Sequence, residues 1–207
     1  MWDMLLERCP DLEELVMDGF SSSRPTAAYR LAEGSWPKLR KLYLGDVLTE
    51  PPTPAVLNPQ SKRRLITFLD AHSTIERLQL SAHVNLHPVS FNGIQRHSLP
   101  LLEHFSGSIF HASTLRSYRT LKSLRLDEPL HLRQSILPAF CSVLEHFPRL
   151  ESLWVSLLVD KPEQARPFLV TAFKAASNLR SLRLYLGVMP SVTVVRSFPP
   201  VRRQTFD

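Results

Sequence analysis

Leucines and other apolar residues recur along this chain in one short pattern. The pattern reads Leu-x-x-Leu-x-Leu, where x is variable and other apolar residues can replace a leucine. Seven copies occur, and the first apolar residues of these copies are Leu12, Leu39, Ile75, Leu102, Leu121, Leu150 and Leu179. The last two apolar positions of a copy are two residues apart, so they point to one face of a β-strand while the side chains beside them point to the other.

The spacing of the copies points to stacked repeats. The first apolar residues are separated by 27, 36, 27, 19, 29 and 29 residues, mostly in or near the roughly 20–29 residues of a leucine-rich repeat. One short strand cannot bury its apolar side alone, whereas stacked copies share a continuous core. We therefore expect an α/β solenoid, with about seven short parallel strands on a concave face and helices and irregular turns on the convex face. Residues 1–188 form this one domain, and 189–207 form a C-terminal edge segment, with an edge strand at 191–195, and a loose tail.

The segments between the copies contain several amphipathic helical patterns. Residues 1–8 predict the end of a helix whose Met4 and Leu5 cover the first strand. Ser61 is a candidate N-cap for a helix over 62–71, in which apolar residues recur at spacings of three and four. Further helices are expected from about 132 to 147 and within 162–177. In the last of these, Leu169, Phe173 and Ala176 are expected to point inward, with Phe168 beside them. Residues 108–118 are expected to form a turn or a 3₁₀ segment.

The composition is that of an ordinary globular chain, with 43% hydrophobic and 21% charged residues among 207. The two cysteines, Cys9 and Cys141, lie 132 positions apart and do not make a disulfide framework, which favours a reducing compartment. The chain begins with no secretory signal pattern, and no stretch approaches the roughly 18–20 apolar residues of a membrane span. We expect an intracellular protein, cytoplasmic or nuclear, without a membrane partner.

The net charge of +6 is modest and spread along the chain. Lys62-Arg63-Arg64 and Arg202-Arg203 are the densest basic groups, and neither forms a long basic arm. This pattern does not favour nucleic acid as the partner, although a basic solenoid that binds nucleic acid or another polyanion is the alternative.

The candidate binding residues are the variable side chains beside the repeat leucines, which are expected on the concave face. Such faces are binding surfaces, and Trp, Tyr and Arg are the residue types enriched at binding hot spots. Trp154 and Tyr43 are the strongest candidates. The full set is Tyr43, Arg77, Gln79, His104, Arg125, Trp154, Arg183 and Tyr185. The alternative is that these are ordinary half-exposed sheet residues, since aromatic residues are favoured in strands for their shape, and that the arginines are solvated charges.

Motifs for catalysis, cofactors and metals were not found in the sequence. No Gly-x-Ser-x-Gly, phosphate-binding glycine loop, Cys-x-x-Cys or His-Glu-x-x-His occurs. His83 and His87 are four residues apart but adjoin a proline, and Cys141 and His146 are five apart on one expected helix. We therefore predict a protein that is not an enzyme and has no catalytic residue, cofactor or metal site, with Cys141 as a small buried hydrophobe.

Three phrases of the sequence resemble a known family. Residues 9–15 read Cys-Pro-x-Leu-Glu-x-Leu, residues 36–44 read Trp-Pro-x-Leu-x-x-Leu-x-Leu, and residues 147–153 read Phe-Pro-x-Leu-x-Ser-Leu. They resemble the leucine-rich-repeat region of fungal F-box-type proteins over roughly residues 9–188. In that family a helical F-box docks on the adaptor of a cullin-based ubiquitin ligase, and the repeats recruit a substrate.

The resemblance implies a non-catalytic module for protein–protein interaction and substrate recognition, whose partner it does not name. No F-box is visible in this chain, so direct binding of the ligase adaptor is not implied. The asparagine usual three positions after the last apolar residue of a repeat is also missing, so irregular repeats are expected. A third reading is a truncated repeat array without a partner.

Overall fold

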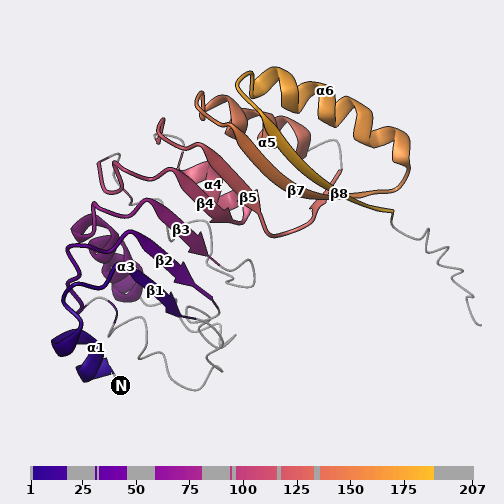
Figure 1. Ribbon diagram of the computed structural model, residues 1–207. Coiled ribbons are helices and arrows are strands. Elements are labelled where there is room, and N and C mark those ends of the chain that lie inside the picture. Colours follow the sequence, from indigo (N-terminus) through magenta and orange to yellow (C-terminus); the bar gives the residue numbers. More distant parts are fainter. Residues whose placement is uncertain are drawn as a thin grey trace, which may run out of the picture.

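The computed structural model describes residues 2–17, 31, 33–45, 59–80, 94, 97–115, 118–132 and 136–188. Within these ranges the chain is a mixed α/β structure with one open, eight-stranded parallel sheet and five α-helices (Figure 1). The expected edge strand at 191–195 and the tail lie outside the described residues. The class and the parallel sheet agree with the sequence-based expectation.

Each of the seven copies of the leucine pattern contributes one strand. These strands are β1 (Glu14–Met17), β2 (Lys41–Leu44), β3 (Arg77–Leu80), β4 (His104–Gly107), β5 (Ser123–Leu126), β7 (Ser152–Val159) and β8 (Ser181–Val188). The eighth strand, β6 (Leu130–His131), has only two residues and was not expected. From β1 to β5 each strand pairs with the next along the chain. Since β8 pairs along the whole length of β7, β5 and β6 share the opposite edge of β7.

Helix α1 (Trp2–Arg8) precedes the first strand, and the other described helices lie between the strands in sequence and on one side of the sheet in space (Figure 1). These are α3 (Pro59–Ala71), α4 (Ile109–Thr114), α5 (Ile136–Glu145) and α6 (Ala165–Ala175), the last preceded by a 3₁₀ turn at Pro162–Gln164. The helices expected near 1–8, 62–71, 132–147 and 162–177 are confirmed. Because α3 begins at Pro59, Ser61 lies inside the helix and is not its N-cap.

The turn expected at 108–118 is wrong, because this segment contains the α-helix α4. Ser108 caps it, and its side-chain oxygen accepts a hydrogen bond of 3.2 Å from the backbone N–H of His111. Ile109, His111 and Ala112 are buried in the layer between α4 and the sheet. Six residues are too few for a helix to be stable on its own, so packing of this buried face stabilises it.

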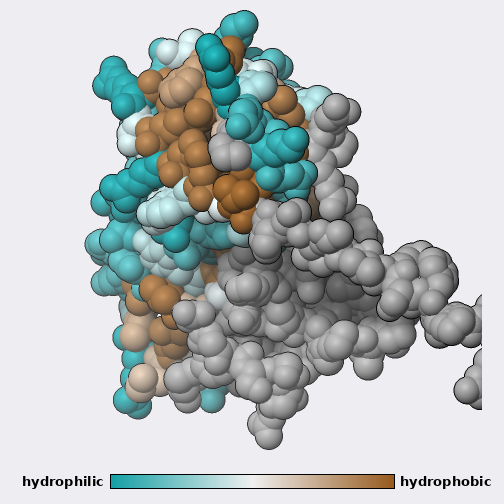
Figure 2. Space-filling model, turned by 90° about the vertical axis from the view of Figure 1, so that its right-hand side faces the viewer, coloured by the Kyte–Doolittle hydropathy of each residue, from teal (hydrophilic) through white to brown (hydrophobic). Residues whose placement is uncertain are grey.

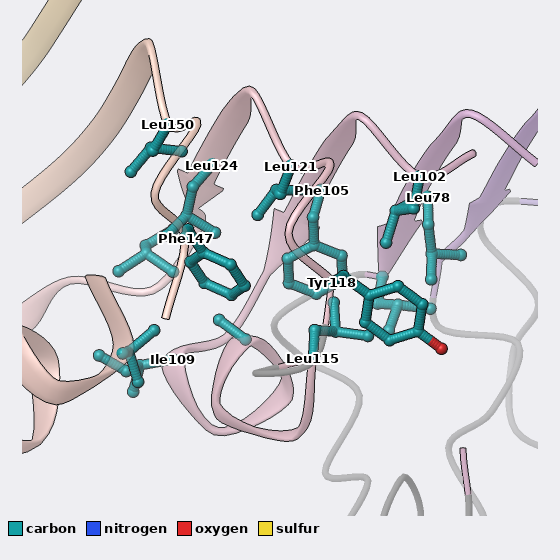
Figure 3. Packing of buried hydrophobic residues seen from close by; sticks show 14 of the residues in the cluster. Leu78, Leu102, Phe105, Ile109, Leu115, Tyr118, Leu121, Leu124, Phe147 and Leu150 are labelled. Carbon is teal, nitrogen blue, oxygen red and sulfur yellow. The ribbon is translucent and has the colours of Figure 1, made fainter. Parts of the chain in front are cut away.

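The hydrophobic core is formed by every second side chain of the strands, which points toward the helices. In β2 and β7 buried and half-buried residues alternate, as the leucine pattern predicts. The buried strand residues and the inner faces of α3, α4, α5 and α6 belong to one continuous hydrophobic cluster (Figure 3). Burial of one leucine or phenylalanine side chain stabilises the fold by about 1.5–3 kcal/mol, so the stacked positions supply the main cohesive energy.

A turn precedes the strand of each of the seven copies, and in six of them it adds one more buried position. The backbone N–H of the first apolar residue donates to the carbonyl three residues earlier in all seven copies, as from Leu39 to Trp36 and from Leu150 to Phe147. Six of these seven earlier residues are buried, namely Trp36, His72, Leu99, Tyr118, Phe147 and Ala176. This recurrent inward position was not recognised in the sequence, although its apolar character is visible there.

In the irregular fourth copy, a large residue and a small one compensate for each other in volume: Phe105 replaces a leucine, and Gly107 replaces an apolar residue. Phe105 occupies the second leucine position with 2% of its surface exposed. A Cβ atom on Gly107, two residues later, would lie 2.8 Å from Cζ of Phe105 and 3.3 Å from the Leu80 carbonyl oxygen. Because glycine lacks this atom, the larger ring of Phe105 fits between β4 and its surroundings.

Two expected orientations are wrong. Met4 in α1 is 56% exposed, whereas Leu5 packs against the core as expected, together with Leu6. In α6, Phe173 is 50% exposed, whereas Phe168 and Ala172 are 1% and 2% exposed. The buried stripe of α6 passes through 168 and 172, and residue 173 is turned about 100° away from 172 at 3.6 residues per turn.

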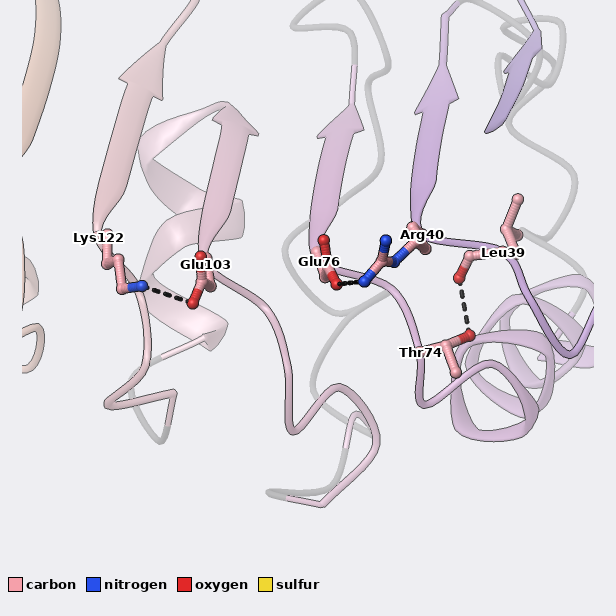
Figure 4. A network of polar contacts seen from close by, with 6 residues as sticks. All are labelled: Leu39, Arg40, Thr74, Glu76, Glu103 and Lys122. Carbon is pink, nitrogen blue, oxygen red and sulfur yellow. Dashed lines mark hydrogen bonds and ion pairs between the residues drawn. The ribbon is translucent and has the colours of Figure 1, made fainter. Parts of the chain in front are cut away.

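Polar contacts tie consecutive copies together beside the turns (Figure 4). The hydroxyl of Thr74 donates to the carbonyl of Leu39 at 2.8 Å, and Thr120 repeats this contact with Leu102 at 2.7 Å. The residue directly after the first apolar residue of a copy forms ion pairs with its counterpart in the neighbouring copy. These pairs join Arg40 to Glu76 at 2.9 Å and Lys122 to Glu103 at 2.6 Å. These exposed pairs contribute at most about 1 kcal/mol each, so they mainly reinforce the register.

Candidate functional site

The candidate site lies on the side of the sheet opposite the described helices, which we call the open face. Strand pairing aligns its side chains in two rows across the strands. The first row is Glu14, Lys41, Arg77, His104, Ser123, Ser152 and Ser181. The second row is Val16, Tyr43, Gln79, Ser106, Arg125, Trp154 and Arg183. All eight sequence-predicted binding residues lie on this face, with Tyr185 two positions beyond Arg183 on β8.

The centre of the candidate site is Trp154, on β7. The guanidinium carbon of Arg125, on β5, lies 3.7 Å from the centre of the Trp154 ring, and that of Arg183, on β8, lies 5.5 Å from it. The Tyr185 ring is stacked against the Trp154 ring with centroids 5.8 Å apart and planes 28° apart. We name Arg125, Trp154, Arg183 and Tyr185 the Trp154 cluster, and three strands therefore contribute to it.

A half-buried carboxylate, that of Asp127, fixes one side of the cluster. Nε of Arg125 donates to Oδ1 of Asp127 at 2.7 Å, and the hydroxyl of Ser106 donates to Oδ2 at 2.7 Å. The Asp127 side chain is only 17% exposed. The guanidinium of Arg125 is thus held over the indole by a carboxylate that is itself anchored to β4, so part of its conformational entropy is already lost before any partner binds.

The other side of the cluster is open. Arg183 forms no ion pair with the described residues, and Tyr185 is 56% exposed. Beside them, Ser123, Ser152 and Ser181 make the adjoining part of the first row small and uncharged. The cluster carries two arginine charges and the adjoining Asp127 supplies one balancing carboxylate, so the net charge of these groups is positive. The rings of Trp154 and Tyr185, the guanidinium donors of Arg183 and the small serine side chains beside them can together accept an extended segment of another molecule.

Tyr43 does not join the cluster. Four strand steps, from β2 through β3, β4 and β5 to β7, separate it from Trp154. At about 4.8 Å per step they are roughly 19 Å apart. Tyr43 instead lies beside Val16, which is 59% exposed, and beside Gln79. The sequence predicted the face of both aromatics but not their separation.

Arg77 and His104 are neighbours in the first row. Burial lowers the pKa of His104 below its ordinary value, and the Arg77 charge lowers it further. His104 is therefore mainly neutral at pH 7. Lys41, on the other side of Arg77, forms an ion pair of 2.8 Å with Glu14, which raises the pKa of the lysine through a hydrogen bond and charge attraction. Arg77 is consequently the free charge of this row within the described residues.

Metal-binding and redox groups do not assemble in the described part of the chain. No three His, Cys, Asp or Glu side chains lie close enough there to hold a metal ion. Cys9 and Cys141 are free thiols, and Cys141 is buried, which raises its pKa. His83 and His87 lie outside the described residues.

No helix among the described residues has both the length and the apolar character needed to cross a bilayer. A comparison of the sequence with protein-family models and with curated proteins finds no match.

Proposed function

We propose that this chain is a leucine-rich-repeat solenoid whose open face is its concave face, and that it acts as a non-catalytic module that binds another protein. In this proposal it resembles the substrate-recognition repeats of F-box proteins in ubiquitin ligases and acts inside the cell, in the cytoplasm or nucleus. The observation that carries the proposal is the Trp154 cluster, in which one tryptophan meets two arginines and a tyrosine on an accessible sheet face.

The chemistry of the cluster supports protein recognition. Tryptophan, tyrosine and arginine dominate the binding energy of protein interfaces because they combine a large apolar area with directional polar groups. Trp154 is partly covered and held between strands that pair on both sides of β7, so its binding surface is preorganised. Arg183 supplies donors that are not occupied by a carboxylate in the described structure, which favours a partner with acidic or carbonyl groups.

A capture experiment tests this proposal. The chain is immobilised and exposed to a reducing cell extract, in parallel with Trp154→Ala and with Phe110→Ala. Phe110 is an exposed aromatic, 55% accessible, on α4 behind the sheet, so it controls for loss of a surface ring. Circular dichroism and urea unfolding must first show that both variants fold as the parent does. Selective loss of a specific protein in Trp154→Ala supports recognition on the open face; equal retention by all three places binding elsewhere and rejects the proposal.

The alternative function is binding of nucleic acid or another polyanion, which the free charges of Arg77 and Arg183 favour. Phosphate contacts give a steep dependence of affinity on salt concentration. Retention on a polyanion that falls steeply with salt and is weakened by Arg77→Ser and Arg183→Ser, but not by Trp154→Ala, would favour this alternative. An absence of any specific partner would favour a truncated repeat array.

A further inference from the structure

The last strand of the sheet carries a long apolar edge. Within the described residues β8 pairs with a neighbour on one side only, β7. Their registers are matched, so the core-side residues of β8 can be compared directly with those of β7. Leu157 and Val159 of β7 are 0% and 1% exposed, whereas their partners Leu186 and Val188 of β8 are 51% and 56% exposed.

Exposed apolar residues concentrate at this end of the molecule. Nine large hydrophobic side chains are strongly exposed in the described structure, and five of them belong to α6 and β8, namely Val170, Phe173, Tyr185, Leu186 and Val188. Figure 2, which looks onto this end, shows apolar side chains gathered in a band with polar ones at its margins. Contiguous apolar patches of this kind mark interaction sites on soluble proteins.

The edge of β8 also has little of the usual protection against strand pairing. Edge strands are normally short or carry charged side chains, proline or an inward-pointing charge. β8 has eight residues, Ser181–Val188, with no proline, one charge (Arg183, on the open face) and leucine or valine at every core-side position. β1, at the other end of the sheet, has four residues and begins with the charged Glu14. The two ends of the sheet therefore differ in their capacity to recruit a further strand.

We propose that this edge binds a second copy of the same chain, by antiparallel pairing of β8 with β8 about a twofold axis at Tyr185. Opposed residues in an antiparallel pair share a face. In this register Leu182 lies opposite Val188 of the second copy, and Leu184 lies opposite Leu186. All four core-side residues are thus matched with apolar residues, as an isologous interface requires.

The open-face side chains fit the same register. Arg183 lies opposite Gly187 of the second copy, which has no side chain, so the two arginine charges are kept apart. Tyr185 lies opposite its own copy, where two aromatic rings can stack. Moving the axis to Leu184 places Val188 opposite Arg180, and moving it to Leu186 places Leu182 opposite a residue beyond β8. The Tyr185 register is the one that pairs all four apolar residues within the strand.

Such a dimer would bring the two Trp154 clusters together on one continuous open face. The inference goes beyond the proposed function and does not depend on it, because the strand edge and the apolar residues exist whether or not the open face binds a partner. An assay of oligomeric state separates the two proposals.

The first test is the mass of the purified chain by light scattering, at concentrations between about 1 and 100 μM, which bracket a micromolar dissociation constant. The expected result is a concentration-dependent shift from 23.7 kDa toward twice that mass. Leu186→Lys should remain monomeric, because pairing would bury two unpaired charges. Leu101→Lys is the matched control, since Leu101 is 50% exposed at a turn remote from β8, and it should still dimerise. A parent that stays monomeric, a dimer that survives Leu186→Lys, or loss of the dimer in both variants would overturn the proposal.

The second test fixes the register and does not depend on a charged variant. Tyr185→Cys places two thiols on the twofold axis, at the Cα separation of about 4.5–5.5 Å of directly opposed residues, which a disulfide can span. Arg183→Cys places them about four residues apart along the strand, roughly 13 Å, which it cannot span. Mild oxidation should therefore yield a covalent dimer with Tyr185→Cys and several-fold less with Arg183→Cys. Equal yields from both, or none from either, would refute this register.

Discussion

The backbone N–H of Trp36 donates a hydrogen bond of 3.0 Å to Nε2 of His72, and the two residues occupy the same inward position in consecutive copies of the leucine pattern. Nδ1 of His72 lies 2.6 Å from the carbonyl oxygen of Phe68. Since Nε2 accepts, Nδ1 carries the proton and donates. The imidazole is therefore a neutral connector between two turns and α3, at a position where other copies place an apolar side chain.

This arrangement predicts a loss of stability in mild acid. Burial lowers the pKa of His72, and the hydrogen bond to Phe68 opposes this only in part. A folded-state pKa below the unfolded value of about 6.5 means that the unfolded chain binds the proton more readily. The free energy of unfolding should thus be highest above pH 6.5 and fall as the pH drops through the folded-state pKa of His72.

Urea unfolding between pH 5 and 8 measures this effect. His72→Leu removes the titrating group and should flatten the decline below pH 6.5. His104 is the necessary comparison, because burial and Arg77 lower its pKa in the same direction. A decline that persists in His72→Leu and disappears in His104→Gln would assign the pH dependence to the open face and contradict the prediction.

Gly107→Ala should destabilise the protein because of the Phe105 ring. The added Cβ meets Cζ of Phe105 at 2.8 Å, and overpacking of a core typically costs about 1–3 kcal/mol. Phe105→Leu restores the residue that other copies carry and makes room, so Gly107→Ala should cost less in that background. The four unfolding free energies form a double-mutant cycle, and additive effects would show that the two sites do not share this space.

The threonines that precede Ile75 and Leu121 should each contribute a hydrogen bond between copies. Thr74→Val and Thr120→Val keep the side-chain shape but remove the donor, leaving the Leu39 and Leu102 carbonyls without it. We expect each change to lower the free energy of unfolding by about 0.5–1.5 kcal/mol. Thr171→Val, which removes a bond within the exposed side of α6, is the control and should change it by less than about 0.5 kcal/mol. Equal losses in all three variants would reject a specific role of the bonds between copies.

The arrangement of the Trp154 cluster predicts unequal coupling with its two arginines. Arg125 lies 3.7 Å from the ring centre and Arg183 lies 5.5 Å from it. A cation–π contact at an exposed site contributes about 0.5–1 kcal/mol. Double-mutant cycles with alanine at each position should give a coupling energy in this range for Arg125 and Trp154, and a smaller one for Arg183 and Trp154. The reverse order would show that the guanidinium of Arg125 is not held over the indole in solution.

Much of the fold was predictable because the leucine pattern is local. Spacing of two residues between Leu42 and Leu44 predicts a strand, and apolar residues at spacings of three and four predict α3, α5 and α6. The short helix α4 was missed because six residues hardly exceed one helical period and show no clear pattern. Phe173 was placed inward because sequence spacing alone does not determine how α6 is rotated about its axis.

The sequence was sufficient to predict on which face of the sheet the candidate residues lie, but not which of them contact one another. Alternation placed Tyr43 and Trp154 on the same side of the sheet, since that requires only strand geometry. Which residues touch depends on strand order and register, which bring Arg125 and Tyr185 to Trp154 and leave Tyr43 four strands away. Asp127, which fixes Arg125, is not among the binding residues predicted from the sequence, although its position two residues after Arg125 was a usable signal.

The central claim is that the open face recognises another protein through Trp154. Its most direct test is titration calorimetry of the purified captured partner against the parent chain, Trp154→Ala and Phe110→Ala. We expect Trp154→Ala to weaken binding at least about 30-fold, the 2 kcal/mol that defines a hot spot, while Phe110→Ala stays within about twofold. Unchanged affinity of a folded Trp154→Ala variant, or an equal loss in Phe110→Ala, would contradict recognition at this site.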